Sequence, residues 1–152
     1  MRGRRRAPQF RERPAGYSLE ARGKRLKAMK IVIVNGPNLN LLGRREPSIY
    51  GNKSMEQVML DIQRAYPDVH FEYRQSNHEG DLIDSLENAA SCYSLKVKDT
   101  VEGIILNAGG YTHTSVALRD AVACCQVPVV EIHISDITKR ETFRRVSLLT
   151  DV

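Results

Sequence analysis

The sequence predicts an α/β fold in which helices cover both faces of a parallel sheet. Four short runs rich in β-branched residues alternate with segments of helical apolar spacing. Strands that are separated by helices are joined by right-handed crossovers, which makes neighbouring strands parallel. The strand runs are continuous rather than alternating, as expected of strands buried on both faces.

The first strand is predicted at residues 30–35 (KIVIVN), which end in Asn-Gly-Pro. A helix is then predicted to begin after Ser54, because Gln57 lies three residues further on and completes a capping box. Pro67 and Asp68 are predicted to end this helix. Five of its apolar side chains share one face: Val58, Met59, Ile62, Ala65 and Tyr66.

The later elements continue the alternation of strand and helix. In chain order they are predicted as strand 69–76, helix 79–95, strand 103–107, helix 114–125 and strand 128–133. Thr114 or Ser115 is predicted to cap the third helix. Residues 136–145 are polar and are predicted to form a loop or a short helix.

Charge divides the chain into two parts. Residues 1–28 carry ten Lys or Arg and two Glu, a net charge of +8, whereas residues 29–152 carry thirteen Lys or Arg and sixteen Asp or Glu, a net charge of −3. The basic leader lacks apolar periodicity and is predicted to be disordered. A nucleic-acid arm, a transit segment and a membrane-surface tether are compatible with it. The cluster Arg2, Arg4, Arg5 and Arg6 has no interleaved aromatic residues, and the leader has little Ser, which favours a solvated tail or a true start at Met29.

Several functional classes are disfavoured. No apolar run is long enough to span a membrane, and no signal core is present. GxGxxG and GxxxxGK[ST] motifs are absent, which disfavours dinucleotide and nucleoside-triphosphate binding. His78, His113 and His133 lack metal-ligand spacing. The odd number of cysteines without a CxxC pair predicts buried free thiols and a reducing compartment. They are Cys92, Cys124 and Cys125.

Polar side chains follow each predicted strand, in the segments 35–40, 75–79, 107–113 and 131–135. In open α/β sheets, ligands bind at the carboxyl ends of the strands, so these segments predict one shared site. Amide side chains suit a polyhydroxylated small molecule. The Arg-rich stretch 140–145 is suited to close over an anionic ligand. The long loop 36–53 is predicted to act as a lid.

Four segments together resemble the signatures of the type II 3-dehydroquinate dehydratase family. They are residues 35–51 (NGPNLNLLGRREPSIYG), 75–80 (QSNHEG), 107–120 (NAGGYTHTSVALRD) and 131–144, which contain EIHIS and RETFR. Long motifs in the right order are far more specific than a single short pattern.

The resemblance implies a flavodoxin-like three-layer sandwich with strand order 2-1-3-4-5. It implies a lyase that removes water from 3-dehydroquinate to give 3-dehydroshikimate through an enolate, in the shikimate pathway or in quinate catabolism. No metal and no cofactor is implied. Members of the family assemble as trimers that associate into dodecamers, and we expect a cytoplasmic location.

The resemblance also assigns catalytic roles. Tyr50 corresponds to the general base that takes a proton beside the ketone. A free tyrosine has a pKa of about 10, so the Arg45 guanidinium is implied to favour the phenolate. Asn38 corresponds to the residue that holds a water at the developing oxyanion. His133 corresponds to the general acid that protonates the departing hydroxyl, and Glu131 to its orienting partner.

Other residues correspond to substrate contacts. The backbone of Ile134 and the hydroxyl of Ser135 correspond to a cradle for the substrate carboxylate. Asp120 corresponds to a residue that reaches the substrate from a neighbouring subunit. Contacts to the ring hydroxyls and the carboxylate region are implied for Asn107, His113 and Arg144.

Taken singly, these residues have simpler interpretations. Tyr50 is compatible with loop packing, Arg45 and Asp120 with solvated surface charges, and the asparagines with turn formation. The joint pattern favours the catalytic interpretation. His78 is predicted to be structural.

The sequence departs from the family pattern at three places. Asp136 stands where the family usually has Asn, beside the carboxylate cradle, and Val146 stands where a His commonly precedes the serine. The family continues with another strand and a C-terminal helix. Domain 29–152 is therefore predicted to lack both, which would leave the fourth strand as an exposed edge.

Three functional hypotheses follow. The first is an active dehydratase with a small-molecule substrate. The second is an inactive truncated remnant that retains only a binding pocket. The third is a nucleic-acid-associated module driven by residues 1–28. The motifs favour the first hypothesis, with neither nucleic acid nor a membrane as partner.

Overall fold

The computed structural model describes residues 29–44, 51–90 and 101–152 as a four-stranded parallel sheet with helices on both faces. The strand order is β2-β1-β3-β4, which confirms the predicted α/β class and the order of these four strands. The strands are β1 (Met29–Asn35), β2 (Val69–Gln75), β3 (Gly103–Asn107) and β4 (Val129–Glu131).

Strand β1 is central and pairs with β2 and β3 in registers that align their carboxyl ends. Asn35, its last residue, lies opposite Gln75 of β2 and Asn107 of β3. Backbone hydrogen bonds continue this alignment into the loops, where the Gly36 N–H donates to the Asn107 carbonyl at 2.7 Å. The Ser76 N–H donates to the Asn35 carbonyl at 3.1 Å. The sheet therefore delivers three polar strand ends to one place.

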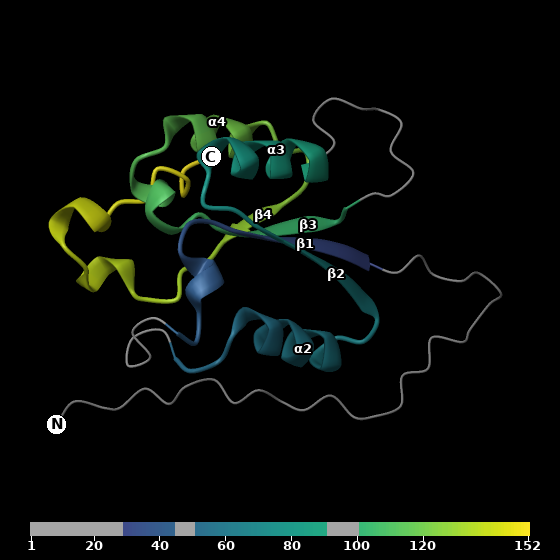
Figure 1. Ribbon diagram of the computed structural model, residues 1–152. Coiled ribbons are helices and arrows are strands. Elements are labelled where there is room, and N and C mark those ends of the chain that lie inside the picture. Colours follow the sequence, from purple (N-terminus) through teal and green to yellow (C-terminus); the bar gives the residue numbers. More distant parts are fainter. Residues whose placement is uncertain (1–28, 45–50, 91–100) are drawn as a thin grey trace, which may run out of the picture.

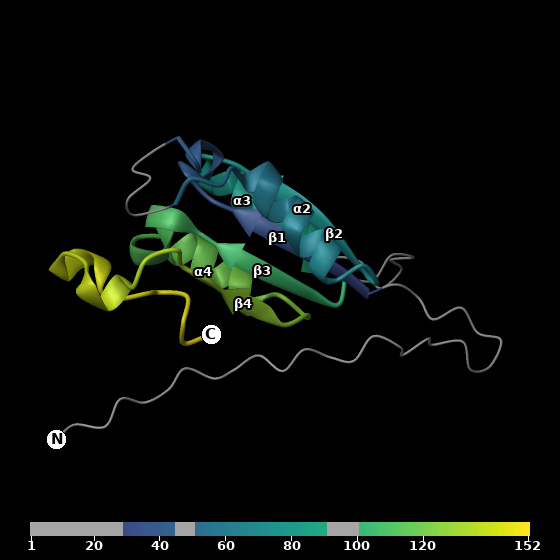
Figure 2. The ribbon, with the colours of Figure 1, turned by 90° about the horizontal axis from the view of Figure 1, so that it is seen from below.

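Within the described residues, three α-helices cover the sheet. Helices α3 (Glu79–Ala90) and α4 (Val116–Ala123) lie together on one face, and α2 (Met55–Ala65) lies on the other (Figure 1). Figure 2, seen from below, shows α2 over β1 and β2 rather than over β4. This three-layer arrangement agrees with the predicted sandwich.

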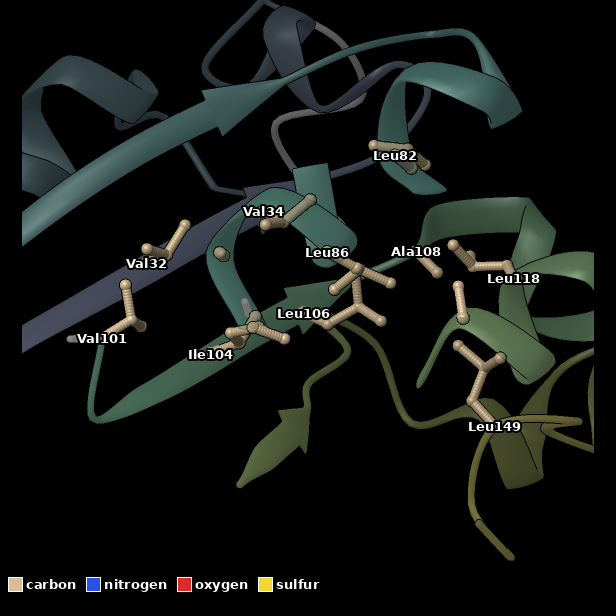
Figure 3. Packing of buried hydrophobic residues seen from close by; sticks show 13 residues of the cluster. Val32, Val34, Leu82, Leu86, Val101, Ile104, Leu106, Ala108, Leu118 and Leu149 are labelled. Carbon is tan, nitrogen blue, oxygen red and sulfur yellow. The ribbon is translucent and has the colours of Figure 1, made fainter. Parts of the chain in front are cut away.

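The main hydrophobic core lies between the sheet and the α3–α4 pair (Figure 3). Leu82 and Leu86 of α3 are fully buried, and in Figure 3 Leu86 packs above Leu106 of β3. Leu149, from the last described segment, is 4% exposed and joins the same core. Burial of these side chains is the main source of stability for the fold.

Local sequence signals fix the starts of two helices. The Ser54 hydroxyl accepts from the Gln57 N–H and the Gln57 side chain accepts from the Ser54 N–H, so the predicted capping box is present. The Ser115 hydroxyl accepts from the Leu118 N–H at 2.8 Å and caps α4, which decides between the two predicted caps. These bonds satisfy donors that the first helical turn leaves free.

Two elements are shorter than predicted. Helix α4 begins at Val116 instead of 114, because Gly109–His113 form a 3-10 helix, η2, that ends in a turn. Strand β4 covers Val129–Glu131 instead of 128–133. Its pairing with β3 ends where Glu131 lies opposite Leu106, and one further bond runs from the Ile132 N–H to the Leu106 carbonyl. The predicted helix 79–95 is described only as far as Ala90.

The segment after β4 contains two short 3-10 helices, η3 (Ile137–Lys139) and η4 (Thr142–Arg144), as its polar character predicted. Within the described residues β4 pairs with β3 alone, and Val130 is 56% exposed. In the same part of the chain, no helix has the length and apolar character needed to cross a membrane.

The core predicts a clear difference between two leucines. Leu86→Ala removes a fully buried side chain from α3 and should lower the free energy of unfolding by about 2–5 kcal/mol. Leu60→Ala on α2 removes a side chain that is 57% exposed and should change it by less than about 0.5 kcal/mol. Urea unfolding followed by circular dichroism measures both, and equal losses would contradict the described packing.

Candidate active site

A cavity of about 190 Å³ lies at the carboxyl ends of the strands. Its described walls come from the loop after β1, from η2 after β3, and from the segment after β4. In Figure 1 these segments meet at the end of the sheet to which the strands run. Seven of the predicted site residues line this cavity: Asn38, Asn107, His113, His133, Ile134, Ser135 and Arg144.

Glu131 lies beside His133 but is not among the described cavity-lining residues. One of its carboxylate oxygens, Oε1, is 3.0 Å from Nε2 of His133. An ionised carboxylate accepts hydrogen bonds and does not donate them, so Nε2 carries the hydrogen. This arrangement leaves Nδ1 as the second ring nitrogen of His133.

The surroundings of Glu131 favour its charged form. Burial of the carboxyl opposes ionisation, but hydrogen bonds from Thr112 and Ser147, the charge of His133 and a bond from Thr150 outweigh it. Together they hold the pKa of Glu131 below its ordinary value. A negative charge is therefore maintained behind His133 at neutral pH.

His113 lies parallel to His133, with ring centroids 6.5 Å apart and an angle of 13° between the planes. Its Nδ1 is 2.7 Å from the Val146 carbonyl oxygen. Because a carbonyl only accepts, Nδ1 carries the hydrogen, and Nε2 of a neutral ring is left as an acceptor. Val146, which stands where a His commonly occurs in the family, thus contributes its backbone carbonyl to the site.

Asn38 is the one described non-glycine residue with positive φ, at 68°. Its backbone N–H donates to Oδ1 of Asn77 at 3.0 Å, and Gln75 Nε2 donates to the same oxygen at 3.2 Å. The Tyr111 hydroxyl donates to the Asn77 carbonyl at 3.1 Å. Asn77 therefore links the loops after three strands, a role that sequence reasoning missed although the motif at 75–80 contained the residue.

A glycine allows these loops to approach closely. A Cβ atom at Gly36 would lie 2.6 Å from the Ala108 carbonyl oxygen, well inside contact distance. Any side chain at this position would push the loop after β1 away from the loop after β3. The cavity therefore requires glycine at the first residue after β1.

The cavity is also lined by basic side chains. Arg140 and Arg144 both line it, and Arg140 Nη1 donates to the Ser135 hydroxyl at 3.1 Å. The sequence had indicated the stretch 140–145 as an anion-binding element but singled out Arg144 alone. Arg140 was missed because nothing in the sequence distinguishes between neighbouring arginines.

Asp136 directs its carboxylate toward η3. Its Oδ1 accepts from the Thr138 hydroxyl at 2.6 Å and the Thr138 N–H at 3.0 Å, and Oδ2 pairs with Lys139 Nζ at 3.0 Å. The Thr138 hydroxyl, the Lys139 ammonium and the Thr138 N–H lower the pKa of Asp136 to about 2. Neighbours on its own segment thus balance the added charge beside the predicted carboxylate cradle.

Besides Glu131, three further predicted site residues are absent from the described cavity wall. Asp120 lies exposed on α4. Arg45 and Tyr50 lie outside the described residues. Among residues 29–44, 51–90 and 101–152, no cluster of three His, Cys, Asp or Glu side chains is positioned to hold a metal ion.

The arrangement combines two chemical properties. One wall presents two imidazoles, one of them backed by a carboxylate, which suits proton transfer. The cavity lining also includes two guanidinium groups, one of them bonded to a serine hydroxyl, which suits a carboxylate. The cavity fits a small hydroxylated anion that gains or loses a proton.

Comparison with known proteins agrees with this description. The family model described as dehydroquinase class II matches residues 29–152. A 3-dehydroquinate dehydratase of an Exiguobacterium species is 52% identical over 125 residues, which cover 82% of this chain and 80% of the relative. One of Prochlorococcus marinus subsp. pastoris is 45% identical over 125 residues, covering 81% and 80%.

Solved structures show the same fold. The type II dehydroquinase of Butyrivibrio crossotus superposes with a TM-score of 0.71 at 40% identity, covering 80% of this chain and 81% of that one. The type II dehydroquinase of Propionibacterium acnes superposes with a TM-score of 0.70 at 30% identity, covering 82% and 83%.

The backbone of Asn38 gives a test that needs no ligand. Because φ is 68°, Asn38→Ala should lower the free energy of unfolding by about 1 kcal/mol relative to Asn38→Gly. At Asn40, inside the 3-10 helix Leu39–Leu41 (η1), the order should reverse, with Gly less stable than Ala. Urea unfolding of the four variants measures both differences. An Ala variant that is more stable than the Gly variant at residue 38 would show that this residue does not hold the left-handed conformation.

Proposed function

The chain belongs to the class II dehydroquinase family, and we propose that it removes water from 3-dehydroquinate to give 3-dehydroshikimate through an enolate intermediate. The observation that carries this proposal is that seven residues implied by three of the four motifs line one cavity. A shikimate-pathway or quinate-catabolism step suits this chemistry.

Proton abstraction is assigned to Tyr50, with Arg45 favouring its phenolate. Both residues lie outside the described part of the chain. Leu41 and Leu42, just before them in the same loop, line the cavity. Loss of the proton beside the ketone creates an enolate, whose oxygen needs a hydrogen-bond donor. We assign to Asn38, which also lines the cavity, the role of holding a water that donates to this oxygen.

Loss of the hydroxyl is assigned to His133 as general acid. Since Nε2 is engaged by Glu131 at 3.0 Å, Nδ1 is the nitrogen that gives a proton to the departing hydroxyl. The Glu131 carboxylate can balance the positive charge of the doubly protonated ring. His113 offers an acceptor and Asn107 an amide, both of which suit the ring hydroxyls of the substrate.

Binding of the substrate carboxylate is assigned to the segment after β4. We assign the cradle to Ser135 and the backbone at Ile134, which line the cavity together with Arg144. We add Arg140, because it lines the cavity and orients the Ser135 hydroxyl. A bidentate guanidinium contact would fix the ring relative to His133.

Assembly and location rest on the family resemblance. We propose that the chain forms trimers that associate into dodecamers in the cytoplasm. Asp120 is exposed on α4 and is absent from the described cavity wall, which is compatible with contact to substrate in a neighbouring subunit. Sedimentation of the protein, with Asp120→Ala as a variant that should lose activity without losing assembly, tests this proposal.

Turnover is tested by the ultraviolet absorbance of the conjugated product. The chain should convert 3-dehydroquinate, and Tyr50→Phe should reduce kcat by at least about 100-fold because the base is lost. Tyr66→Phe is the matched control, since Tyr66 packs edge-on against Phe71 near the opposite end of β2 and should retain activity.

Folded wild-type protein without turnover would reject the dehydratase and leave the alternative of a remnant that only binds. Full activity of Tyr50→Phe would remove this residue from the mechanism.

The charge of Asp136 should have little effect on substrate binding. Asp136→Asn should change KM by less than about twofold, because Thr138 and Lys139 already occupy the carboxylate. With its pKa lowered to about 2, the carboxyl stays ionised from pH 5 to 8 and should add no pH dependence to KM in that range. Arg144→Ala, at the cavity, should raise KM at least about tenfold. A larger effect of Asp136→Asn in steady-state kinetics would contradict this orientation.

A further inference from the structure

The carboxylate of Glu131 is enclosed by hydroxyl groups that come from two other parts of the chain. Thr112, at the end of η2, donates to Oε1. The Ser147 hydroxyl lies 3.0 Å from Oε1 and 2.8 Å from Oε2, and the Thr150 hydroxyl donates to Oε2 at 3.2 Å. With His133 on Oε1, both carboxylate oxygens are occupied. We refer to Thr112, Ser147 and Thr150 as the hydroxyl cradle.

The segment that carries Ser147 is held firmly against the fold. The Leu148 N–H donates to the Thr112 carbonyl at 2.8 Å, and Arg119 Nη1 of α4 donates to the Leu148 carbonyl at 2.5 Å. Leu149 is buried in the main core. Ser147 is thus anchored on its C-terminal side, while the Val146 carbonyl before it binds His113.

The donor and acceptor pattern fixes the direction of the Ser147 hydroxyl. Its oxygen accepts from the Leu149 N–H at 3.0 Å, so its single hydrogen points toward the Glu131 carboxylate. The Thr112 side chain is fully buried, and its hydroxyl also donates to that carboxylate. Neither hydroxyl is placed to contact a molecule in the cavity, because neither residue is part of the described wall.

We propose that Thr112 and Ser147 are positioning residues that hold the Glu131 carboxylate in the orientation in which it fixes His133 for proton donation. The inference rests on the proposed function and deepens it. Each residue acts through Glu131, and Glu131 acts through the imidazole. A shift of the carboxylate would rotate the ring and misalign Nδ1, and small misplacements of a reacting group reduce turnover strongly.

The charged and titratable surroundings of the cradle are simple. Among the described residues, His133 faces Glu131 from its own segment, His113 of η2 stacks on His133, and Arg119 of α4 binds the Leu148 carbonyl behind Ser147. The hydroxyl donors favour the ionised carboxyl, so removing one should raise the pKa of Glu131. The acidic limb of the kcat profile should then move to higher pH, since protonated Glu131 no longer fixes the ring.

The first test compares Ser147→Ala with wild type. The variant should lose about 10- to 100-fold in kcat with less than a twofold change in KM, and its acidic limb should lie at higher pH. Ser147→Thr, which keeps the hydroxyl, should recover most of the activity. Ser85→Ala is the matched control, because this serine donates within α3 to the Asp81 carbonyl and should leave kcat unchanged.

A double-mutant cycle with Glu131→Gln separates positioning from simple anchoring of the segment. If Ser147 acts through the carboxylate, Ser147→Ala should cost less than about twofold in kcat once Glu131→Gln is present. The same loss in both backgrounds would overturn the proposal, as would an unchanged kcat and pH profile. Circular dichroism and thermal unfolding establish that each variant is folded.

A readout independent of turnover is the carboxyl pKa of Glu131, followed by carbon NMR of labelled protein. It should lie below the ordinary glutamate value in wild type and rise in Ser147→Ala. An unchanged titration of the Glu131 carboxyl in Ser147→Ala would overturn the proposed effect of the hydroxyl cradle, whether or not the protein is active. Absence of turnover in folded wild type, with the expected NMR shift, rejects the dehydratase and the positioning role but leaves the cradle geometry intact.

Discussion

The site depends on the parallel register of the central strand β1 with both of its neighbours. Asn35 lies level with Gln75 and Asn107, so three loops leave the sheet at the same height. A shift of one residue in either pairing would move each side chain of the strand to the opposite face of the sheet and separate the loops. The core fixes this register, because the buried residues Val32 and Val34 can pack against α3 in one alignment alone.

The loops meet because polar groups at the strand ends bind one another's backbones. Gly36 permits contact with Ala108, and Asn77 accepts from the loop that carries Asn38 while its own carbonyl is bound by Tyr111. Such bonds satisfy backbone N–H and C=O groups that would otherwise lack a hydrogen-bond partner at the ends of buried strands. Some of the polar groups at the strand ends therefore hold the loops together around the cavity, and the others line the cavity.

Negatively and positively charged side chains have separate places at the site. The Glu131 anion pairs with His133 and accepts hydrogen bonds from hydroxyl donors, whereas Arg140 and Arg144 line the cavity. An anionic ligand in the cavity would thus meet two cations, while the Glu131 carboxylate is not part of the described wall. Asp136 does not disturb this division, because Thr138 and Lys139 hold its charge on η3. One short segment after β4 supplies both signs of charge.

The sequence determined the alternation of strands and helices, the capping box at Ser54 and the gathering of polar motifs at one edge of the sheet, because each of these depends on local spacing. The resemblance of its motifs to a known family also pointed to His133 and Glu131 as partners, and their side chains lie 3.0 Å apart. Tertiary structure alone decided that strand β4 ends at Glu131, that Asn77 clamps the loop of Asn38, and that Ser147 reaches Glu131. These contacts join residues 16 or 39 positions apart, and their geometry follows from packing that no local pattern records.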